Sequence, residues 1–557
     1  MANDTDTTAQ YNFIPLNSCV VPAEISGNND KEISEKYINH VQHKGKHTGY
    51  FEISLKAKDY LLIGDGESEE GEKNPFKVND TYYIPGSSIR GCIKNLYKII
   101  SCSAFREGED YKNQKFYHRN MFISDNEPGK EIPKLGILVH NKIDDCYYIC
   151  EYPGSKKAYG YDKDKPSVKW KKDTAQIVSD VIGEKDNCFT IYLKNVNWSE
   201  PFIITEETKS VYVNDKNRGS VNILKCMKDH PEIKYAGTEN FDEYYPCFFF
   251  EEDGKVKHFG GCKRYRIQYE KGIADHVVID DLDVVNVDFT DSIFGKKELW
   301  GSRVFFDNLQ LEDNDNTKPT RNIVILGEPK ATCTANYLEP NYSNRIPSYD
   351  EDVRIRGYKF YWHKSYQNNT EQKTTGKNDN VKTILHPIKP QKNFVGKIRF
   401  ENLSDLEFGS LLYLFQILQE KNTGIKLGAA KNLGMGTVIL QDCKIFERSE
   451  DYYKKLFEGD SWNDYSILPV GQSSSLVAQF KDYVENCENH SRSNSVFEYC
   501  KEEPLEYSQR IEILKKALRT DWEDEFGSEV WKKKTADMGF EKRKKPLLDV
   551  EKIVHDK

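Results

Sequence analysis

The chain lacks any long apolar run. No stretch of its 557 residues approaches the roughly 18 consecutive apolar residues of a membrane-spanning helix. Its first residues are polar and acidic, where a signal peptide would be basic and then apolar. With a mean hydropathy of -0.74 and 30% charged residues, these absences predict a cytoplasmic globular protein with a heavily charged surface.

The usual cysteine and glycine motifs are also missing. The 13 cysteines form no CxxC pair, so neither a disulfide framework nor a common zinc spacing is present. The nearest metal pattern joins Cys146 and Cys150 to His258 and Cys262, but it matches no standard finger, and we expect packing thiols and no firm metal or cofactor. A nucleotide-binding P-loop is unlikely, because residues 66–73 lack its required ending.

Positive charge is not in excess. The net charge is -9 and the isoelectric point is about 5.9. Binding of nucleic acid over the whole surface is therefore disfavoured, since phosphate neutralisation needs clustered Lys and Arg, and any RNA site must be local. The 34 Tyr and 28 Phe could supply stacking surfaces, although most aromatics in a chain this long pack the core.

The chain is too long for one ordinary core. We predict an N-terminal segment at 1–46, a core in two parts at 47–105 and 286–445, an insertion at 106–285 and a mainly helical extension at 446–557. The two core parts hold the clearest strand and helix patterns, whereas residues 106–285 are irregular in pattern. Large insertions into one domain and a series of separate units would give the same length.

The clearest local pattern is a strand followed by a helix. A strand is predicted at 81–84, and the following turn at 85–88 has serines that can cap a helix over 89–101. The apolar stripe of that helix leaves Arg90 and Lys94 on other faces, where they can meet a partner.

Further along, three segments keep a regular pattern. A turn at 301–307 feeds a buried strand, residues 393–400 alternate as a strand, and Ser404 lies where a helix opens. The glycine-rich stretch 426–438 then leads into another strand.

Three motifs in this order resemble the RAMP superfamily of CRISPR-associated proteins: IPGSSIRG at 84–91, FG followed by GSRVFFD ending at Asp307, and KLGAAKNLGMGTV at 426–438. LLIGDG at 61–66 and RGYKFYWHK at 356–364 also look like a long RAMP subfamily found at type III CRISPR loci. The resemblance implies an α+β fold built from modified ferredoxin-like, RRM-like units. It explains neither the insertion nor the C-terminal extension.

The resemblance also implies a function. The chain would be a guide-RNA-binding, backbone-type subunit of a type III effector complex in antiviral defence. Its partners would be guide RNA, complementary target RNA and other CRISPR-associated effector subunits, with no membrane. A serine turn at a helix start offers N–H groups to a phosphate, and glycines let an RNA backbone approach. The implied RNA-binding residues are Gly86, Ser87, Ser88, Arg90, Lys94, Arg303, Gly428, Lys431, Asn432, Gly434 and Gly436.

Whether the chain cuts RNA is left open by the sequence. Backbone RAMP subunits cleave target RNA with an aspartate in the loop before the PGSS turn, in a metal-dependent reaction. Here the matching position falls on or near Asn74, which cannot act as a base or bind a cation with full charge. Asp65, Glu67 and Asp80 lie close enough in sequence to substitute, and Mg²⁺ or Mn²⁺ would then be the cofactor.

Two other functions remain. A guide-precursor processing endoribonuclease would use a histidine as general acid or base, and the candidates are His40, His43, His47, His118 and His363. An accessory protein would keep the RAMP scaffold without binding RNA. The feature that distinguishes them is whether Arg90, Lys94, Arg303 and Lys431 converge on one positive groove.

Overall fold

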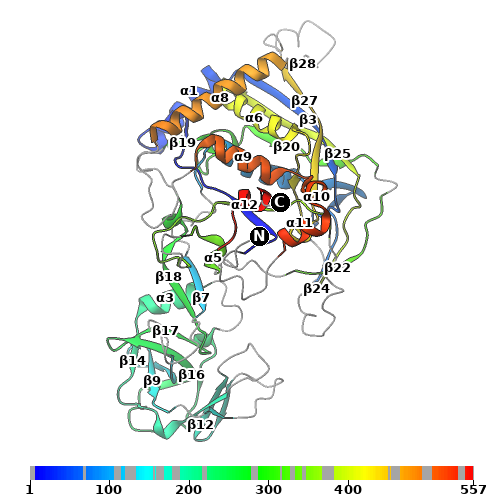
Figure 1. Ribbon diagram of the computed structural model, residues 1–557. Coiled ribbons are helices and arrows are strands. Elements are labelled where there is room, and N and C mark those ends of the chain that lie inside the picture. Colours follow the sequence, from blue (N-terminus) through cyan, green and yellow to red (C-terminus); the bar gives the residue numbers. More distant parts are fainter. Residues whose placement is uncertain are drawn as a thin grey trace. The chain divides into compact units, whose positions relative to one another are not determined.

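The structure is a computed structural model, which describes residues 7–66, 71–105, 115–119, 133–154, 157–158, 168–178, 188–215, 222–277, 286–313, 317–326, 333–340, 346–366, 382–448, 452, 465–468, 470–491, 505–536 and 546–555. The chain forms two compact units (Figure 1). The core unit consists of Met1–Asn113 with Ile273–Lys557, and the inserted unit is Gln114–Gly272, which falls within the predicted insertion.

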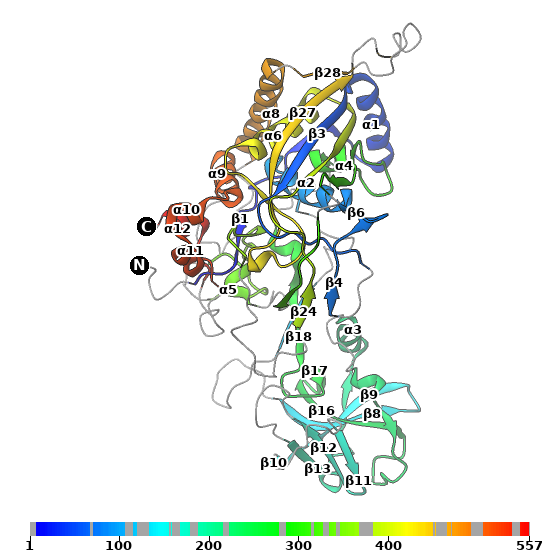
Figure 2. The same ribbon diagram turned by 90° about the vertical axis from the view of Figure 1, so that its right-hand side faces the viewer.

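The centre of the core unit is an antiparallel sheet. Strand β3 (His47–Ala57) lies between β25 (Asn393–Leu403) and β27 (Thr437–Arg448). Figure 2 shows β3 and β27 side by side. Strands β20 (Val304–Phe306) and β21 (Leu309–Leu311) both pair with β25 on its other side. Residues 393–400 are therefore a strand, as predicted.

Two helices complete a ferredoxin-like unit. Helix α2 (Gly86–Ile100) follows β3 and precedes β20, and α6 (Asp405–Gln419) connects β25 to β27. The chain order is thus β-α-β-β-α-β, and the strands lie in the spatial order fourth, first, third, second. The predicted α+β ferredoxin-like fold is confirmed.

The sheet has a covered inner face and an open outer face. Along β3, Phe51, Ile53 and Leu55 are buried, whereas the alternate residue Glu52 is exposed and Tyr50 and Ser54 are partly exposed. On the inner side, Ile53 and Leu55 meet Ile89 and Ile93 of α2 around a cavity of about 20 Å³. The predicted stripe of α2 thus packs on the sheet.

The start of α2 differs from the prediction. The helix begins at Gly86, so the serines lie inside its first turn, and the N-cap Pro85 makes no side-chain cap bond. The Gly86 N–H instead donates to Asn308 Oδ1 at 2.8 Å. Glycine is needed because a Cβ at this position would lie 2.2 Å from the Phe306 carbonyl oxygen. The predicted serine cap is therefore wrong.

Helix α6 starts as the sequence predicts. Ser404 is its N-cap, and its side chain accepts from the Glu407 N–H while the Glu407 carboxylate accepts from the Ser404 N–H. This reciprocal capping box fixes the first turn of the helix.

The first residues of the chain belong to the core unit. Strand β1 (Tyr11–Ile14) pairs with β23 (Tyr358–Tyr361), and β2 (Pro22–Ser26) pairs with β19 (Asn286–Asp288). Helix α1 (Asp30–Lys44) buries Ile33, Tyr37 and His40.

The C-terminal extension is mainly helical where the structure describes it, with the short strand β28 (Tyr465–Ile467) before the helices. Its helices are α8 (Val470–Ser491), α9 (Tyr507–Leu518), α10 (Trp522–Phe526), α11 (Ser528–Lys534) and α12 (Val550–His555). Figure 1 shows α8 beside α6, and α9 contributes to the same core. No helix in the described ranges is long and apolar enough to cross a membrane.

Shorter elements complete the core unit: β4 (Glu72–Lys73), β5 (Lys77–Val78), β6 (Thr81–Ile84), α4 (Phe289–Phe294), β22 (Asn322–Ile325), α5 (Thr334–Tyr337), β24 (Lys382–Leu385), β26 (Ile425–Lys426) and β28 (Tyr465–Ile467). Strand β6 pairs with β21, and β28 pairs with the end of β27.

The inserted unit contains a closed ring of five strands. The strands are β8 (Lys134–Asn141), β9 (Cys146–Tyr152), β14 (Phe202–Ile204), β16 (Phe241–Glu252) and β17 (Lys255–Gly260). Strand β8 pairs with β9, and β9 pairs with β14. Strand β14 pairs in parallel with β17, and β16 closes the ring by pairing with both β17 and β8. With α3 (Glu206–Asn214) between the third and fourth strands, this is the connectivity of an OB-fold.

A second sheet packs on this ring. It consists of β10 (Lys157–Ala158), β11 (Val168–Lys171), β12 (Thr174–Val178) and β13 (Cys188–Tyr192). Its Ile177 and Ile191 share a core with Ile137 and Tyr152 of the ring. Strands β7 (Lys115–Arg119) and β18 (Arg266–Gly272) pair with each other, and β15 (Lys228–Asp229) pairs with β16. The irregular sequence pattern thus contains a regular fold.

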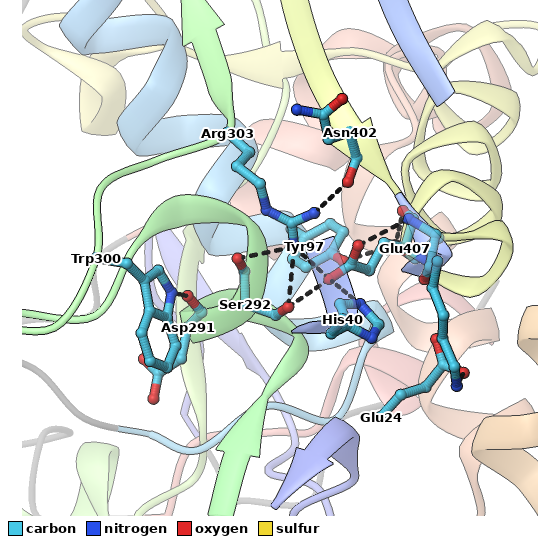
Figure 3. A network of polar contacts seen from close by, with 12 residues as sticks. Glu24, His40, Tyr97, Asp291, Ser292, Trp300, Arg303, Asn402 and Glu407 are labelled. Atoms are coloured by element: carbon cyan, nitrogen blue, oxygen red, sulfur yellow. Dashed lines mark hydrogen bonds and ion pairs between the residues drawn. The ribbon is translucent and has the colours of Figure 1, made fainter. Parts of the chain in front are cut away.

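A buried ionic network joins the elements of the core unit (Figure 3). Glu407 on α6 is 1% exposed and forms an ion pair with Arg303, which precedes β20. Nε2 of His40, on α1, lies 3.3 Å from the same carboxylate. Arg303 also donates to the Asn402 carbonyl at 2.6 Å and to Ser292 Oγ of α4 at 3.2 Å. Burial alone would raise the pKa of Glu407, but His40 and Arg303 lower it to about 2.

Replacing Glu407 by Gln is expected to lower the free energy of unfolding at pH 7 by about 3 kcal/mol, because Arg303 would remain buried without its counter-ion. The folded-state pKa of Glu407 lies below its unfolded value, so this stabilisation is present above pH 4.5 and is lost as the pH falls towards 2. Urea unfolding at several pH values measures the difference. Glu420→Gln is the control, since its carboxylate is 44% exposed and should matter by under about 1 kcal/mol.

Candidate nucleic-acid interface

Backbone hydrogen bonds bring three predicted motif segments together. The Ala429 N–H of the glycine-rich loop donates to the Leu62 carbonyl at 2.8 Å. The Phe76 N–H donates to the Ile63 carbonyl at 2.8 Å, and the Tyr83 N–H donates to the Phe76 carbonyl at 3.2 Å. Tyr83 belongs to β6, which leads directly into α2. The glycine-rich loop, residues 62–65 with 74–76, and the start of α2 therefore form one continuous region.

Two of the four catalytic candidates lie side by side. The Asp65 N–H donates to the Asn74 carbonyl at 3.2 Å, next to a bridge between Gly64 and Pro75. Asp80 occupies the turn between β5 and β6, where it pairs with Lys77 at 2.8 Å. Glu67 lies outside the described residues. The backbone of Asp65 therefore pairs with that of Asn74, the position where the resemblance places the family's aspartate.

No group of three or more His, Cys, Asp or Glu in the described ranges could hold a metal ion. The cysteine pair weighed as a zinc candidate lies on β9. There Cys150 is buried, and burial raises the pKa of its thiol to about 12, which disfavours the thiolate that binds a metal.

Basic groups flank both sides of an exposed ridge on α2. Ser87, Gly91 and Asn95 recur every four residues and are exposed, and a Cβ at Gly91 would meet nothing within 4 Å. On one side of the ridge, Arg90 donates to the Phe294 carbonyl at 2.9 Å, and its guanidinium carbon lies 5.8 Å from the centroid of the Phe294 ring. Lys94 Nζ lies 6.0 Å from the same centroid.

On the other side of the ridge, α2 faces the glycine-rich loop. Burial raises the pKa of the Cys92 thiol to about 11, and the nearby charge of Lys431 acts against this rise. Lys431 and Asn432 belong to a single 3₁₀ turn, Lys431–Leu433, and both are partly exposed. Burial and then the charges of Lys98 and Arg90 lower the pKa of Lys94. An anion on the ridge would relieve this crowding of positive charge.

The glycines of the loop are packed against protein backbone. Gly428, Gly434 and Gly436 have φ values of 77°, 106° and 82°. A Cβ at Gly428 would lie 2.0 Å from the Leu62 carbonyl oxygen, and one at Gly434 would lie 2.6 Å from that of Ser365. The expected close approach is therefore to the chain's own backbone, and the loop presents Lys431 and Asn432 instead.

A partly buried lysine that the sequence did not single out, Lys426, holds this loop in place. Lys426 Nζ donates to the carbonyls of Gly434 at 2.6 Å and Met435 at 3.0 Å. Burial lowers its pKa to about 7, against the favourable charge of Asp59. The signal in the sequence that could have identified Lys426 is its position at the start of the glycine-rich motif.

Arg303 is not part of this region. It is 7% exposed and its guanidinium is committed to Glu407, Ser292 and Asn402. The four cations whose convergence would favour RNA binding therefore do not all converge. Arg90 and Lys94 lie on α2, Lys431 lies near Cys92 of the same helix, and Arg303 is buried in the core.

The candidate histidines are dispersed. His40 approaches Glu407, His47 is bound between Glu447 and Asp405, and His43 is exposed. His363 is buried, and burial lowers its pKa well below 6.5. His118 packs on Tyr269 in the inserted unit. No two of them share a described site.

Fold and site define an α+β protein with a ferredoxin-like unit and a localised basic surface in an acidic chain. A model of the RAMP superfamily matches residues 54–439, which is more than half of the chain, and the chain belongs to this superfamily. No curated protein matches it in sequence. Among solved structures, a chain of the "Cryo-EM structure of the Type III-B Cmr-beta bound to cognate target RNA" is 12% identical, with coverage of 72% of this chain and 97% of that chain and a TM-score of 0.18.

Gly428→Ala is expected to destabilise the core unit by about 2 kcal/mol or more, because it combines a positive φ with a backbone clash. Gly91→Ala is the matched control and should stabilise the protein by roughly 0.5–1 kcal/mol, since the site is open and helical. Urea unfolding midpoints test both changes. An unchanged midpoint for Gly428→Ala would contradict the packing role of the loop glycines.

Proposed function

We propose that this protein binds guide RNA as a backbone-type subunit of a type III CRISPR effector complex. The observation that carries the proposal is the ridge of α2, which has Arg90 and Lys94 on one side and Lys431 on the other in a chain of net charge -9. Positive charge concentrated at one place is what local binding of an RNA backbone requires.

The ridge suits a sugar–phosphate chain. Its members are small or polar, so nothing projects from it that would obstruct a backbone lying across the helix. Ser87 and Ser88 lie in the first turn of α2, where the helix dipole favours a phosphate and their hydroxyl groups can donate to it. Contacts of this kind do not depend on base identity, so any guide sequence would be accepted.

The remaining partners follow from this role. Membership of the RAMP superfamily and the resemblance of its motifs to a type III subfamily support assembly with other effector subunits. A guide held along its backbone leaves its bases available to pair with a complementary transcript. Antiviral recognition would then be performed by the guide, with this chain as its holder.

Replacing Lys94 by Gln and Lys431 by Glu together is expected to reduce the RNA that co-purifies with the assembled complex by roughly tenfold, because contacts on both sides of the ridge are lost. Gln is chosen at position 94 in place of Glu, because the nearby Asp288 and Asp291 would repel a new carboxylate. RNA content per protein, with sequencing of the bound RNA, is the measurement.

The control for this experiment is Lys31→Gln with Lys421→Glu, two exposed lysines on other elements. It should retain the wild-type RNA content. If the ridge variant also retains it, the guide-binding proposal fails and an accessory role without RNA is favoured.

Cleavage of target RNA is a second candidate activity, favoured by the position of Asp65 beside Asn74. If this carboxylate takes the place of the family's aspartate, it would hold Mg²⁺ or Mn²⁺ at the scissile phosphate and supply the charge that Asn74 lacks.

Asp65→Asn should then abolish cleavage of complementary RNA by the purified complex in Mg²⁺ or Mn²⁺, with unchanged guide content. Asp80→Asn is the control and should cut at the wild-type rate, because its partner is Lys77. Product lengths on a denaturing gel report the result. A complex that binds target without cutting it, in either form, is a holder only.

A further inference from the structure

The second sheet of the inserted unit covers the surface where OB-folds usually bind their ligands. An OB-fold binds along its second and third strands, which are β9 and β14 here. Cys150 and Tyr152 of β9 are buried and share a core with Ile177 and Ile191 of the second sheet. Because that core fills the usual site along β9, the exposed surface in this part of the unit is the opposite face of the second sheet.

Strand register divides the second sheet into two faces, and Figure 2 shows its strands β11, β12 and β13. Ala175 of β12 lies opposite Ile191 of β13, and both are buried against the ring. The next row contains Lys171, Thr174 and Tyr192, which lie opposite one another on the three strands. Since successive side chains alternate across a strand, this row belongs to the opposite face. Tyr192 is 39% exposed there.

Four lysines lie around Tyr192 and form a lysine patch, which consists of Lys169, Lys171, Lys172 and Lys194. The first two alternate along β11, about 7 Å apart on the face of Tyr192. The third lies in the turn after β11, and the fourth lies in the 3₁₀ turn after β13. The Leu193 N–H donates to the Asp173 carbonyl at 3.0 Å, which holds these two turns together.

The lysine patch is not neutralised by neighbouring carboxylates. None of its four side chains forms an ion pair with a described residue, and three of the four lysines are exposed. Asp173 is the one carboxylate in the described part of the second sheet. Burial and then the charge of Asp173 raise the pKa of Tyr235, which packs against the inner core. The carboxylate of Asp173 therefore acts on the inner side of the sheet.

The sequence around the patch has the same excess of positive charge. Residues 154–172 contain seven Lys and two Asp, and residues 154–194 contain nine Lys against six Asp and Glu. The inserted unit carries 26 Lys and Arg against 25 Asp and Glu, whereas the rest of the chain carries 54 against 64. Positive charge is therefore concentrated in this part of the inserted unit.

We propose that the lysine patch and Tyr192 bind a single-stranded polynucleotide. The patch extends over at least two strand spacings, about 10 Å, so a small anion would contact only part of it, whereas a chain of phosphates can follow it. An unpaired base stacks on the exposed ring of Tyr192, and a duplex does not fit because its bases are already stacked on one another. Thr174 and Gln176 on the same face can donate to and accept from base edges.

A protein partner is less suited to this face. Tyr192 is the one large apolar side chain that the described part of the second sheet exposes, so no continuous apolar patch is formed. Lysine is also depleted in protein–protein interfaces. The site lies in the inserted unit and shares no residue with the ridge of α2, so its test does not depend on the guide-binding proposal.

Tyr192→Ala in the full chain is expected to weaken binding of a fluorescently labelled oligouridine by about tenfold, whereas Tyr192→Trp keeps the wild-type affinity because it retains a stacking surface. Lys171→Gln with Lys172→Gln should reduce the magnitude of the slope of log K against log salt by about 1.4, the value for two lost phosphate contacts. Anisotropy titrations measure both effects. Oligodeoxyuridine of the same length distinguishes RNA from DNA as the ligand, and a duplex of that length should bind more weakly.

The matched control is Lys142→Gln with Lys225→Gln, two exposed lysines on other elements of the inserted unit, which should keep the wild-type slope. All variants are titrated in wild type and in the Lys94→Gln, Lys431→Glu background. A loss of affinity on Tyr192→Ala in that background supports the polynucleotide site whether or not the guide proposal holds.

Wild-type affinity and salt slope in both patch variants, at wild-type unfolding midpoints, would overturn the proposal. If the lysine variant aggregates with unchanged affinity for oligouridine, the lysines serve to keep the edge strand β11 from pairing with other chains, and the proposal is wrong. A loss of co-purifying subunits with unchanged affinity also overturns it, since the face would then be a protein interface.

Discussion

The buried pair of Arg303 and Glu407 holds the core unit together. Glu407 caps its own helix and neutralises an arginine that enters from the other half of the sheet, and His40 of α1 approaches the same carboxylate. An unpaired charge at this depth would be costly, so the helices and strands that carry these residues are tied to one arrangement. Because no other described carboxylate lies within ion-pair distance of Arg303, its position fixes that of β20 relative to α6.

This constraint explains why the sheet has one covered side and one open side. With α2 and α6 held on the inner face, the apolar residues of β3 and β25 are covered, and the alternate residues of the same strands are left outside. The exposed ridge of α2 then lies on the helix side of this sheet.

Several motif residues serve packing more than contact with a ligand. Gly86 lets α2 approach Phe306, Gly428 lets the loop approach Leu62, and Arg303 is consumed by the core. Those left at the surface are the polar members of the same motifs, Ser87, Lys431 and Asn432 among them. A family motif therefore combines a scaffold and the side chains that the scaffold presents, and sequence alone does not separate the two.

The sequence by itself determined the α+β class, the stripe of α2, the strand at 393–400 and the Ser404 start of α6, because each depends on local periodicity or capping. Tertiary structure alone decided that Arg303 is buried, that Lys431 lies near Cys92 of α2, and that Phe305, Arg399, Tyr50 and Phe446 lie opposite one another on adjacent strands. It also revealed the five-stranded ring in residues 114–272, whose strands are short and are interrupted by a second sheet. Periodicity reports which side of an element is buried, but not what lies against it, since partners distant in sequence are chosen only when the chain folds.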